Sequence, residues 1–96
     1  MNNYRVYILE CKDKSLYIGI TTDVIRRLSE HNKGTASKYT RTRLPVKVFW
    51  YSPWTMDRSF ASKIEYGIKQ FSVKQKREVR NMPLTILLLL IKGEKI

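Results

Sequence analysis

The stretch LYIGITTDVIRRLSEH, residues 16–31, joins a strand pattern to the start of a helix. Apolar residues occupy every second position of its first five residues, which is typical of a strand with one apolar face. Thr22 or Asp23 then predicts a helix N-terminus, because either side chain can accept a hydrogen bond from the free amides of the first turn. The stretch therefore predicts a strand that leads directly into a helix.

Four residues of this stretch bring polar chemistry together. Arg27 and His31 stand four positions apart on the predicted helix, so they project from the same face. Tyr17 and Gly19 lie on the second face of the predicted strand. We therefore expect a phenol, a guanidinium and an imidazole to share one neighbourhood around a residue without a side chain.

The rest of the chain predicts a small α/β (α+β) sandwich, in which a three-stranded antiparallel sheet is flanked by helices in the order β-β-α-β-α-α. The expected strands are residues 4–10, 16–21 and 45–51, and the expected helices are 23–32, 57–71 and 73–81. Residues 45–51 are largely apolar on both faces, so we expect them to form the central or most covered strand. Residues 33–44 predict a loop.

The C-terminal end differs in composition from the rest. We expect residues 1–82 to form one domain and residues 83–96 an apolar tail of unknown role. The run LTILLLLI at 84–91 predicts a strand or a helix over an exposed apolar face, or a homodimer contact. It is about half the ~20 residues that a membrane-spanning helix needs, so no membrane span is expected.

The charge balance points to a polyanionic partner. The chain has 19 basic and 8 acidic residues, a formal net charge of +11, and such an imbalance costs self-repulsion without a partner. We expect nucleic acid, DNA rather than RNA; a solvated surface and an anionic membrane bound through the tail are the alternatives. The expected nucleic-acid contacts are Arg5, Arg26, Lys33, Lys38, Tyr39, Arg41 and Arg43.

The cysteine content indicates the redox state of the cellular compartment. The single cysteine, Cys11, excludes a disulfide within the chain and favours a reducing cytoplasm. The N-terminal residues 1–14 are polar and charged, without the apolar core of a signal peptide. We therefore expect a cytoplasmic protein.

The spacing of these residues resembles the signature of the GIY-YIG nucleases. Tyr17-Ile18-Gly19 matches its second half, with Arg27 eight residues after the glycine and His31 four residues later. Tyr7 stands ten residues before Tyr17, where the first half ends. The resemblance covers roughly residues 4–80 and is closest to small stand-alone bacterial members and to the nuclease domain of structure-specific, junction-cutting enzymes.

Two further positions complete the comparison with the family pattern. Arg5 replaces the glycine of the first half, which is a departure. Glu65, on the predicted helix 57–71, fits the glutamate that the family places downstream. The resemblance implies that Glu65 holds one divalent ion, Mg²⁺ or Mn²⁺.

The resemblance implies a metal-dependent endonuclease that hydrolyses phosphodiester bonds in DNA with little sequence specificity. It also implies selectivity for DNA structure and a place in DNA repair or recombination. Arg27 would clamp the scissile phosphate and Tyr7 would act as general base or orient the attacking water, while Tyr17 and His31 complete the hydrogen-bond network. The alternative is a non-enzymatic nucleic-acid-binding module that retains the fold.

Overall fold

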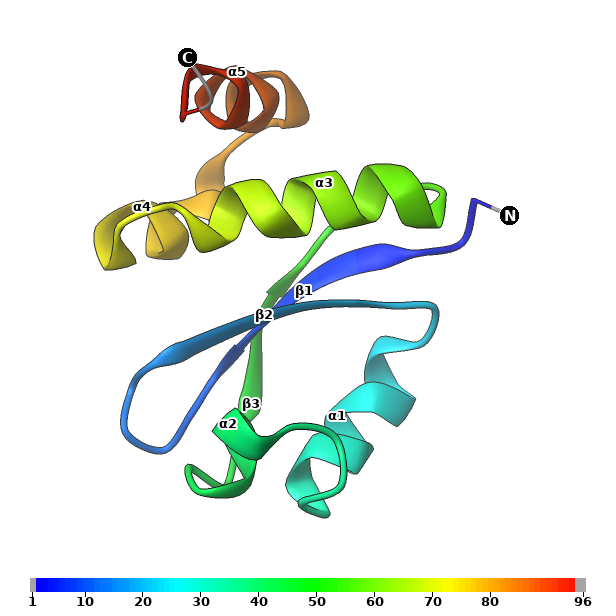
Figure 1. The fold of residues 1–96 in the computed structure, drawn as a ribbon, viewed down its shortest axis with the longest axis vertical. Coiled ribbons are helices and arrows are strands. Elements are labelled where there is room, and N and C mark those ends of the chain that lie inside the picture. The colour runs from blue at the N-terminus through cyan, green and yellow to red at the C-terminus, as the bar shows by residue number, and fades with distance from the viewer. Residues whose placement is uncertain (1, 95–96) are drawn as a thin grey trace.

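The computed structural model describes residues 2–94, and it has the predicted sheet with helices on both faces (Figure 1). Strand β1 (Arg5–Glu10) pairs antiparallel with β2 (Leu16–Thr21) and with β3 (Lys47–Tyr51). The helices are α1 (Val24–Asn32), α2 (Lys38–Arg41), α3 (Arg58–Lys69), α4 (Val73–Glu78), the 3₁₀ turn η1 (Val79–Asn81) and α5 (Leu84–Glu94). The predicted α+β class and the order β-β-α-β-α-α are confirmed, with α2 and α5 as additional elements.

The central strand is β1, so the expectation that residues 45–51 occupy the centre is wrong. The strand order is β2-β1-β3, and β3 is an edge strand with exposed residues at both ends. Both faces of β3 are apolar because helical segments cover them, and not because the strand is central in the sheet. Arg77 and Arg80, for example, lie over the Phe49 ring at 5.5 and 4.6 Å from its centroid.

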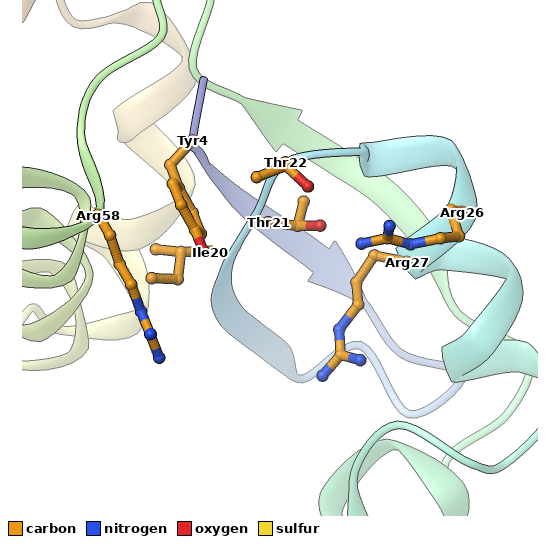
Figure 2. Close-up of a pocket in the computed structure, with 7 residues that line it drawn as sticks. All are labelled: Tyr4, Ile20, Thr21, Thr22, Arg26, Arg27 and Arg58. Carbon is orange, nitrogen blue, oxygen red and sulfur yellow. The ribbon is translucent and has the colours of Figure 1, made fainter. Parts of the chain in front are cut away.

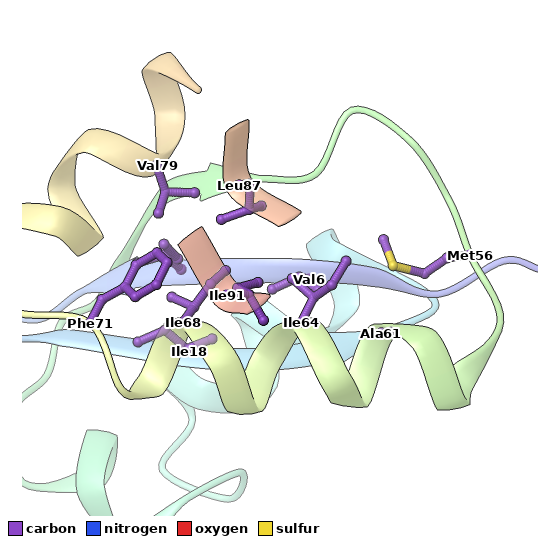
Figure 3. Packing of buried hydrophobic residues seen from close by; sticks show 11 residues of the cluster. Val6, Ile18, Met56, Ala61, Ile64, Ile68, Phe71, Val79, Leu87 and Ile91 are labelled. Carbon is purple, nitrogen blue, oxygen red and sulfur yellow. The ribbon is translucent and has the colours of Figure 1, made fainter. Parts of the chain in front are cut away.

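Alternation along β1 creates two apolar layers. Val6 and Ile8 point to the α3 side, where they join the larger cluster shown in Figure 3. Tyr7 and Leu9 point to the opposite face, which α1 and α2 cover, and join a smaller cluster there. The face of β1 that carries Tyr7 is therefore the one against which α1 packs.

Side-chain caps position α1 and α3 at the sheet. Asp23, rather than Thr22, caps α1 by accepting a hydrogen bond from the Arg26 amide at 3.0 Å. Asp57 caps α3 in the same way, through the Phe60 amide at 2.8 Å. These caps fix where each helix begins relative to β2 and β3.

Helix α2 lies within residues 33–44, so the expectation of a loop there is wrong over these four residues. The Ser37 hydroxyl caps it by accepting hydrogen bonds from the amides of Tyr39 (3.0 Å) and Thr40 (3.3 Å). Thr40 itself is fully buried against α1. A single turn of helix has too few residues to produce a periodic pattern in the sequence.

The apolar run 84–91 forms the helix α5, which packs against α3 (Figure 1). Leu87 and Ile91 are buried in the same cluster as the α3 side of the sheet, and Ile91 approaches α3 at Gly67, where an added Cβ would lie 2.6 Å from it. Residues 95–96 of the expected tail lie outside the described residues. Over residues 2–94, no helix combines the length and hydrophobicity that a membrane crossing requires.

Candidate active site

The hairpin register places a tyrosine directly over a glycine. Tyr7 of β1 pairs with Gly19 of β2, and a Cβ at position 19 would lie 2.5 Å from the Tyr7 hydroxyl oxygen. The Tyr7 ring is almost fully buried, so it has little room to move away. Gly19 is therefore required for the close approach of this phenol to the β2 backbone.

The Tyr7 phenol meets the chain's single histidine. His31, in the last turn of α1, is fully buried. Its Nε2 lies 2.9 Å from the Tyr7 hydroxyl, and its Nδ1 lies 2.8 Å from the Thr40 hydroxyl of α2. An imidazole bound through both nitrogens has its ring orientation fixed.

One assignment of the hydrogens satisfies every group along this series of hydrogen bonds. In that assignment, the Thr40 hydroxyl donates to the Ser37 carbonyl at 3.4 Å, and its oxygen accepts from His31 Nδ1–H at 2.8 Å. Nε2 then carries the lone pair and accepts from the Tyr7 O–H. His31 is thus oriented to receive the phenolic proton.

The titration behaviour of both groups keeps the resting pair neutral. Burial lowers the pKa of His31 to about 4, and the nearby Arg27 guanidinium adds to this effect. Burial raises the pKa of Tyr7 above its ordinary value of 10, while Arg27 opposes part of the increase. At neutral pH the pair is therefore a neutral phenol donating to a neutral imidazole.

Arg27 supplies the positive charge at this centre. Its guanidinium pairs with Glu30 at 2.9 Å, and this contact raises the pKa of Arg27. About a third of its side chain remains exposed, so the fork of donors can also reach an external anion. Planar, permanently charged guanidinium groups match the geometry of phosphate oxygens.

Glu65 approaches the centre from the other side of the sheet. It lies on α3, its side chain is 22% exposed, and it pairs with Lys69 at 3.2 Å. Its charge contributes to the raised pKa of Tyr7, so the carboxylate acts electrostatically on the phenol. The edge strand β2 thus lies between Arg27 from α1 and Glu65 from α3.

The residues present fit a hard, hydrated cation rather than an all-protein metal cage. Within the described part of the chain, no cluster of three or more His, Cys, Asp or Glu side chains could hold an ion. Mg²⁺ commonly binds through one or two carboxylates together with waters and phosphate oxygens. The partly exposed carboxylate of Glu65 matches that requirement.

Comparison with known families agrees with this arrangement. A family model described as the GIY-YIG catalytic domain matches residues 3–78. The chain belongs to the GIY-YIG family. Tyr7, Gly19, Arg27 and His31 all lie within the matched region, and the family is one of nucleases.

Small proteins of similar length share this GIY-YIG sequence. The chain is 46% identical over 80 residues to the UPF0213 protein HQ_3675A of Haloquadratum walsbyi, and the aligned region covers 82% of this chain and 89% of that protein. It is 49% identical over 76 residues to the UPF0213 protein SH2523 of Staphylococcus haemolyticus, covering 79% and 92%. The solution structure of the protein EF2693 from E. faecalis is similar, with a TM-score of 0.53, 40% identity and coverage of 81% and 85%.

The structure brings three of the five GIY-YIG site residues predicted from sequence into ring contact. The Tyr17 ring lies 6.5 Å from the Tyr7 ring and 5.1 Å from the His31 ring, between centroids. Arg27 is coupled electrostatically to both Tyr7 and His31, and Glu65 is coupled to Tyr7. Tyr7, Tyr17 and His31 therefore form one cluster, on which Arg27 and Glu65 act through their charges.

The predicted nucleic-acid contacts separate into two groups. Tyr39 stacks on Tyr17 at 6.1 Å and carries Arg43 over its ring at 3.8 Å, and Tyr17 and Tyr39 line a cavity of about 290 Å³ with Lys69. The exposed residues Lys33, Lys38 and Arg41 lie nearby on α2 or beside α1 and α2. Arg26 pairs with Glu30 at 3.6 Å.

Arg5 belongs to the second group, because its contacts lie towards β3. It donates to the Ser52 carbonyl at 2.7 Å and lies 5.7 Å from the centroid of the Tyr51 ring. The open position beneath the Tyr7 phenol is supplied by Gly19 of β2. The arginine that replaces the family glycine therefore makes structural contacts at the β3 edge.

Sequence reasoning missed two residues of this region. Thr40 was not predicted because no periodic pattern in the segment 33–44 indicated a buried hydroxyl nine positions after His31. The position of Arg58 at the cavity that it lines was not predicted, because it depends on which strand lies beside the start of α3. The acceptor pattern Ser37-x-x-Thr40, a cap followed by a polar residue on the inner side of the turn, was the available signal for Thr40.

Proposed function

We propose that this protein is a metal-dependent endonuclease that hydrolyses phosphodiester bonds in DNA with little sequence specificity and selects DNA by its structure, in DNA repair or recombination in the cytoplasm. Membership of the GIY-YIG family supports nuclease activity in general. The observation that carries the proposal is the buried Tyr7–His31 hydrogen bond beside Arg27.

The attacking water must lose a proton, and Tyr7 and His31 supply the route. The Tyr7 oxygen takes a proton from water while its own proton moves to His31 Nε2, 2.9 Å away. His31 accepts it on the lone pair that the Thr40 contact leaves free. No phenolate accumulates, in agreement with the raised pKa of Tyr7.

The resulting hydroxide attacks phosphorus, and the P–O bond to the leaving oxygen breaks. Arg27 stabilises the negative charge that grows on the non-bridging oxygens, as preorganised cations do in phosphoryl transfer. Tyr17 packs against the Tyr7 and His31 rings and holds them in place. The leaving oxygen takes a proton from solvent, and His31 returns its proton to the Tyr7 oxygen as the phenol releases one to solvent, which restores the resting pair and completes the hydrolysis.

Glu65 would hold the divalent ion, Mg²⁺ or Mn²⁺. When bound, such an ion supplies charge neutralisation at phosphate oxygens. In the free protein, Lys69 occupies the carboxylate at 3.2 Å. Glu65 would therefore exchange a partly exposed ion pair, which contributes little to stability, for the ion.

The surface around this centre suits a nucleic acid. The net charge of +11 provides the attraction to phosphate, and the proposed contacts are Arg5, Arg26, Lys33, Lys38, Tyr39, Arg41 and Arg43. A homodimer through α5 stays a prediction; the exposed Leu89 and Ile86 of that helix motivate it.

A non-enzymatic DNA-binding module is the second candidate. It is favoured by the ion pairs that engage Arg27 and Glu65, since both groups already have partners in the free protein. Under this alternative the chain binds DNA, and no metal-dependent product forms.

A cleavage assay separates the two candidates. Single-stranded, duplex and branched DNA would be incubated with Mg²⁺, Mn²⁺ or chelator, using wild type, Glu65→Ala and Tyr7→Phe. Tyr7→Phe removes only the hydroxyl, and Tyr51→Phe, on exposed β3, is its matched control. Product that needs metal and disappears in both site variants but not in the control supports the nuclease; binding without product supports the module.

A further inference from the structure

A cavity of about 260 Å³ opens where β2 leads into α1, beside the start of α3. Three arginines line it, Arg26 and Arg27 from α1 and Arg58 from α3, together with Tyr4, Ile20, Thr21 and Thr22. Figure 2 shows Arg58 on one side of this arginine pocket and the two α1 arginines on the other. The proposed hydrolysis does not use Arg58.

The backbone fixes the position of Arg58. Tyr4 and Met56 form an antiparallel bridge, in which each amide donates to the other's carbonyl at 2.9 Å. This bridge holds the start of α3 next to the first residues of β1, whose Arg5 pairs with Thr21 of β2. The start of α3 therefore lies beside the turn that precedes α1.

The protein balances the charge of the arginine pocket only in part. Glu30 pairs with Arg26 at 3.6 Å and Arg27 at 2.9 Å, but it is not among the residues that line the cavity. Within residues 2–94, no carboxylate lies within 4.0 Å of the Arg58 guanidinium. Like charges gathered around a hollow repel one another unless an anion neutralises them.

We propose that the arginine pocket binds the backbone phosphate next to the scissile one. Arg27 belongs both to the Tyr7–His31 centre and to the pocket, so a strand with its scissile phosphate at Arg27 has a neighbouring phosphate at the pocket mouth. Arg58 provides the fork of donors for that phosphate, and the exposed Thr22 lies at the same wall. The inference rests on the proposed nuclease function and sets the direction in which DNA crosses β2.

The test measures binding in chelator, without cleavage. A short branched DNA, whose junction fixes one binding register, would carry one uncharged methylphosphonate at each backbone position in turn, and affinity would be measured over a range of salt concentrations. The variants are Arg58→Gln, Arg58→Lys and Lys63→Gln. Lys63 is the matched control, because it is an exposed cation of the same helix that faces α5 instead of the arginine pocket.

In Arg58→Gln, the slope of log affinity against log salt should fall in magnitude by about 0.9, the value for one lost phosphate contact on duplex DNA. Arg58→Lys should keep that slope, and Lys63→Gln should match wild type. One methylphosphonate position should weaken wild type about fivefold, as for an exposed ion pair, and leave Arg58→Gln unchanged.

Equal behaviour of Arg58→Gln and Lys63→Gln would overturn the arginine pocket as a phosphate site. The pocket is also overturned if every methylphosphonate weakens Arg58→Gln as much as wild type. If the expected binding pattern appears but no DNA is cut in metal, the nuclease is overturned and the pocket stands as a backbone phosphate site. A wild-type chain that binds no DNA overturns both.

Discussion

Thr40→Val tests whether the hydroxyl of α2 sets the proton acceptor of the active site. Valine is close in shape to threonine but cannot accept the hydrogen bond from His31 Nδ1, which now spans 2.8 Å in a fully buried position. Leaving a buried donor without a partner costs roughly 1–3 kcal/mol. The imidazole is then free to move its proton to Nε2, where it no longer accepts from Tyr7.

If that free energy is lost from the transition state, the cleavage rate falls roughly 5- to 150-fold, because each 1.36 kcal/mol is a factor of ten. Thr40→Ser is the matched control, since it keeps the hydroxyl and should stay within about threefold of wild type. Single-turnover cleavage of labelled DNA at saturating protein measures the rate. Unfolding in urea confirms that both variants are folded under the assay conditions.

A second readout follows the tautomer directly. His31 is the chain's single histidine, so the nitrogen-15 spectrum of its ring needs no assignment by mutation. Wild type and Thr40→Ser should carry the proton on Nδ1, and Thr40→Val should shift it towards Nε2. A wild-type proton on Nε2, or equal rates for the valine and serine variants, would refute the reasoning.

The same packing makes three further predictions. The His31 imidazole should titrate near pH 4, whereas in the unfolded chain it binds its proton at about pH 6.5. The free energy of unfolding should therefore be highest above pH 6.5 and fall by about 3 kcal/mol towards pH 4, as measured by urea unfolding. A His31 midpoint near pH 6.5 would contradict the burial argument. Gly19→Ala should displace the Tyr7 ring, costing about 1–3 kcal/mol of stability and most of the activity; retention of full cleavage would show that the ring can shift freely. Leu87→Ala should lower the free energy of unfolding in urea by about 2–5 kcal/mol, while Leu89→Ala, on the exposed side of α5, should lower it far less. Equal losses in the two variants would contradict the packing of α5 described above.

Local pattern was sufficient where the structure depends on neighbours in sequence. The two strands of the hairpin, and the face shared by Arg27 and His31, follow from periods of two and of three to four residues. The contact between Tyr7 and His31 follows once the hairpin register is known, and Gly19 makes the pairing with Tyr7 the one that fits.

Long-range arrangement was not available from pattern. Residues 45–51 are apolar on both faces at an edge, because helices cover both sides of the sheet. Thr40 and Arg58 gain their places from the packing of α2 on α1 and from the Tyr4–Met56 bridge, two contacts that no periodicity encodes. The ion pairs of Arg27 and Glu65 are also features of the folded surface that spacing did not predict.

The pairing of Tyr7 with Gly19 also allows only one register between the two strands of the hairpin. A slip of one residue would turn every side chain of β2 to the opposite face of the sheet. A slip of two would set Tyr7 against Tyr17 or Thr21 in place of Gly19, and neither side chain leaves room for the ring. Only the correctly aligned hairpin lets the phenol reach His31, so the centre proposed to cut nucleic acid cannot assemble on a mispaired chain.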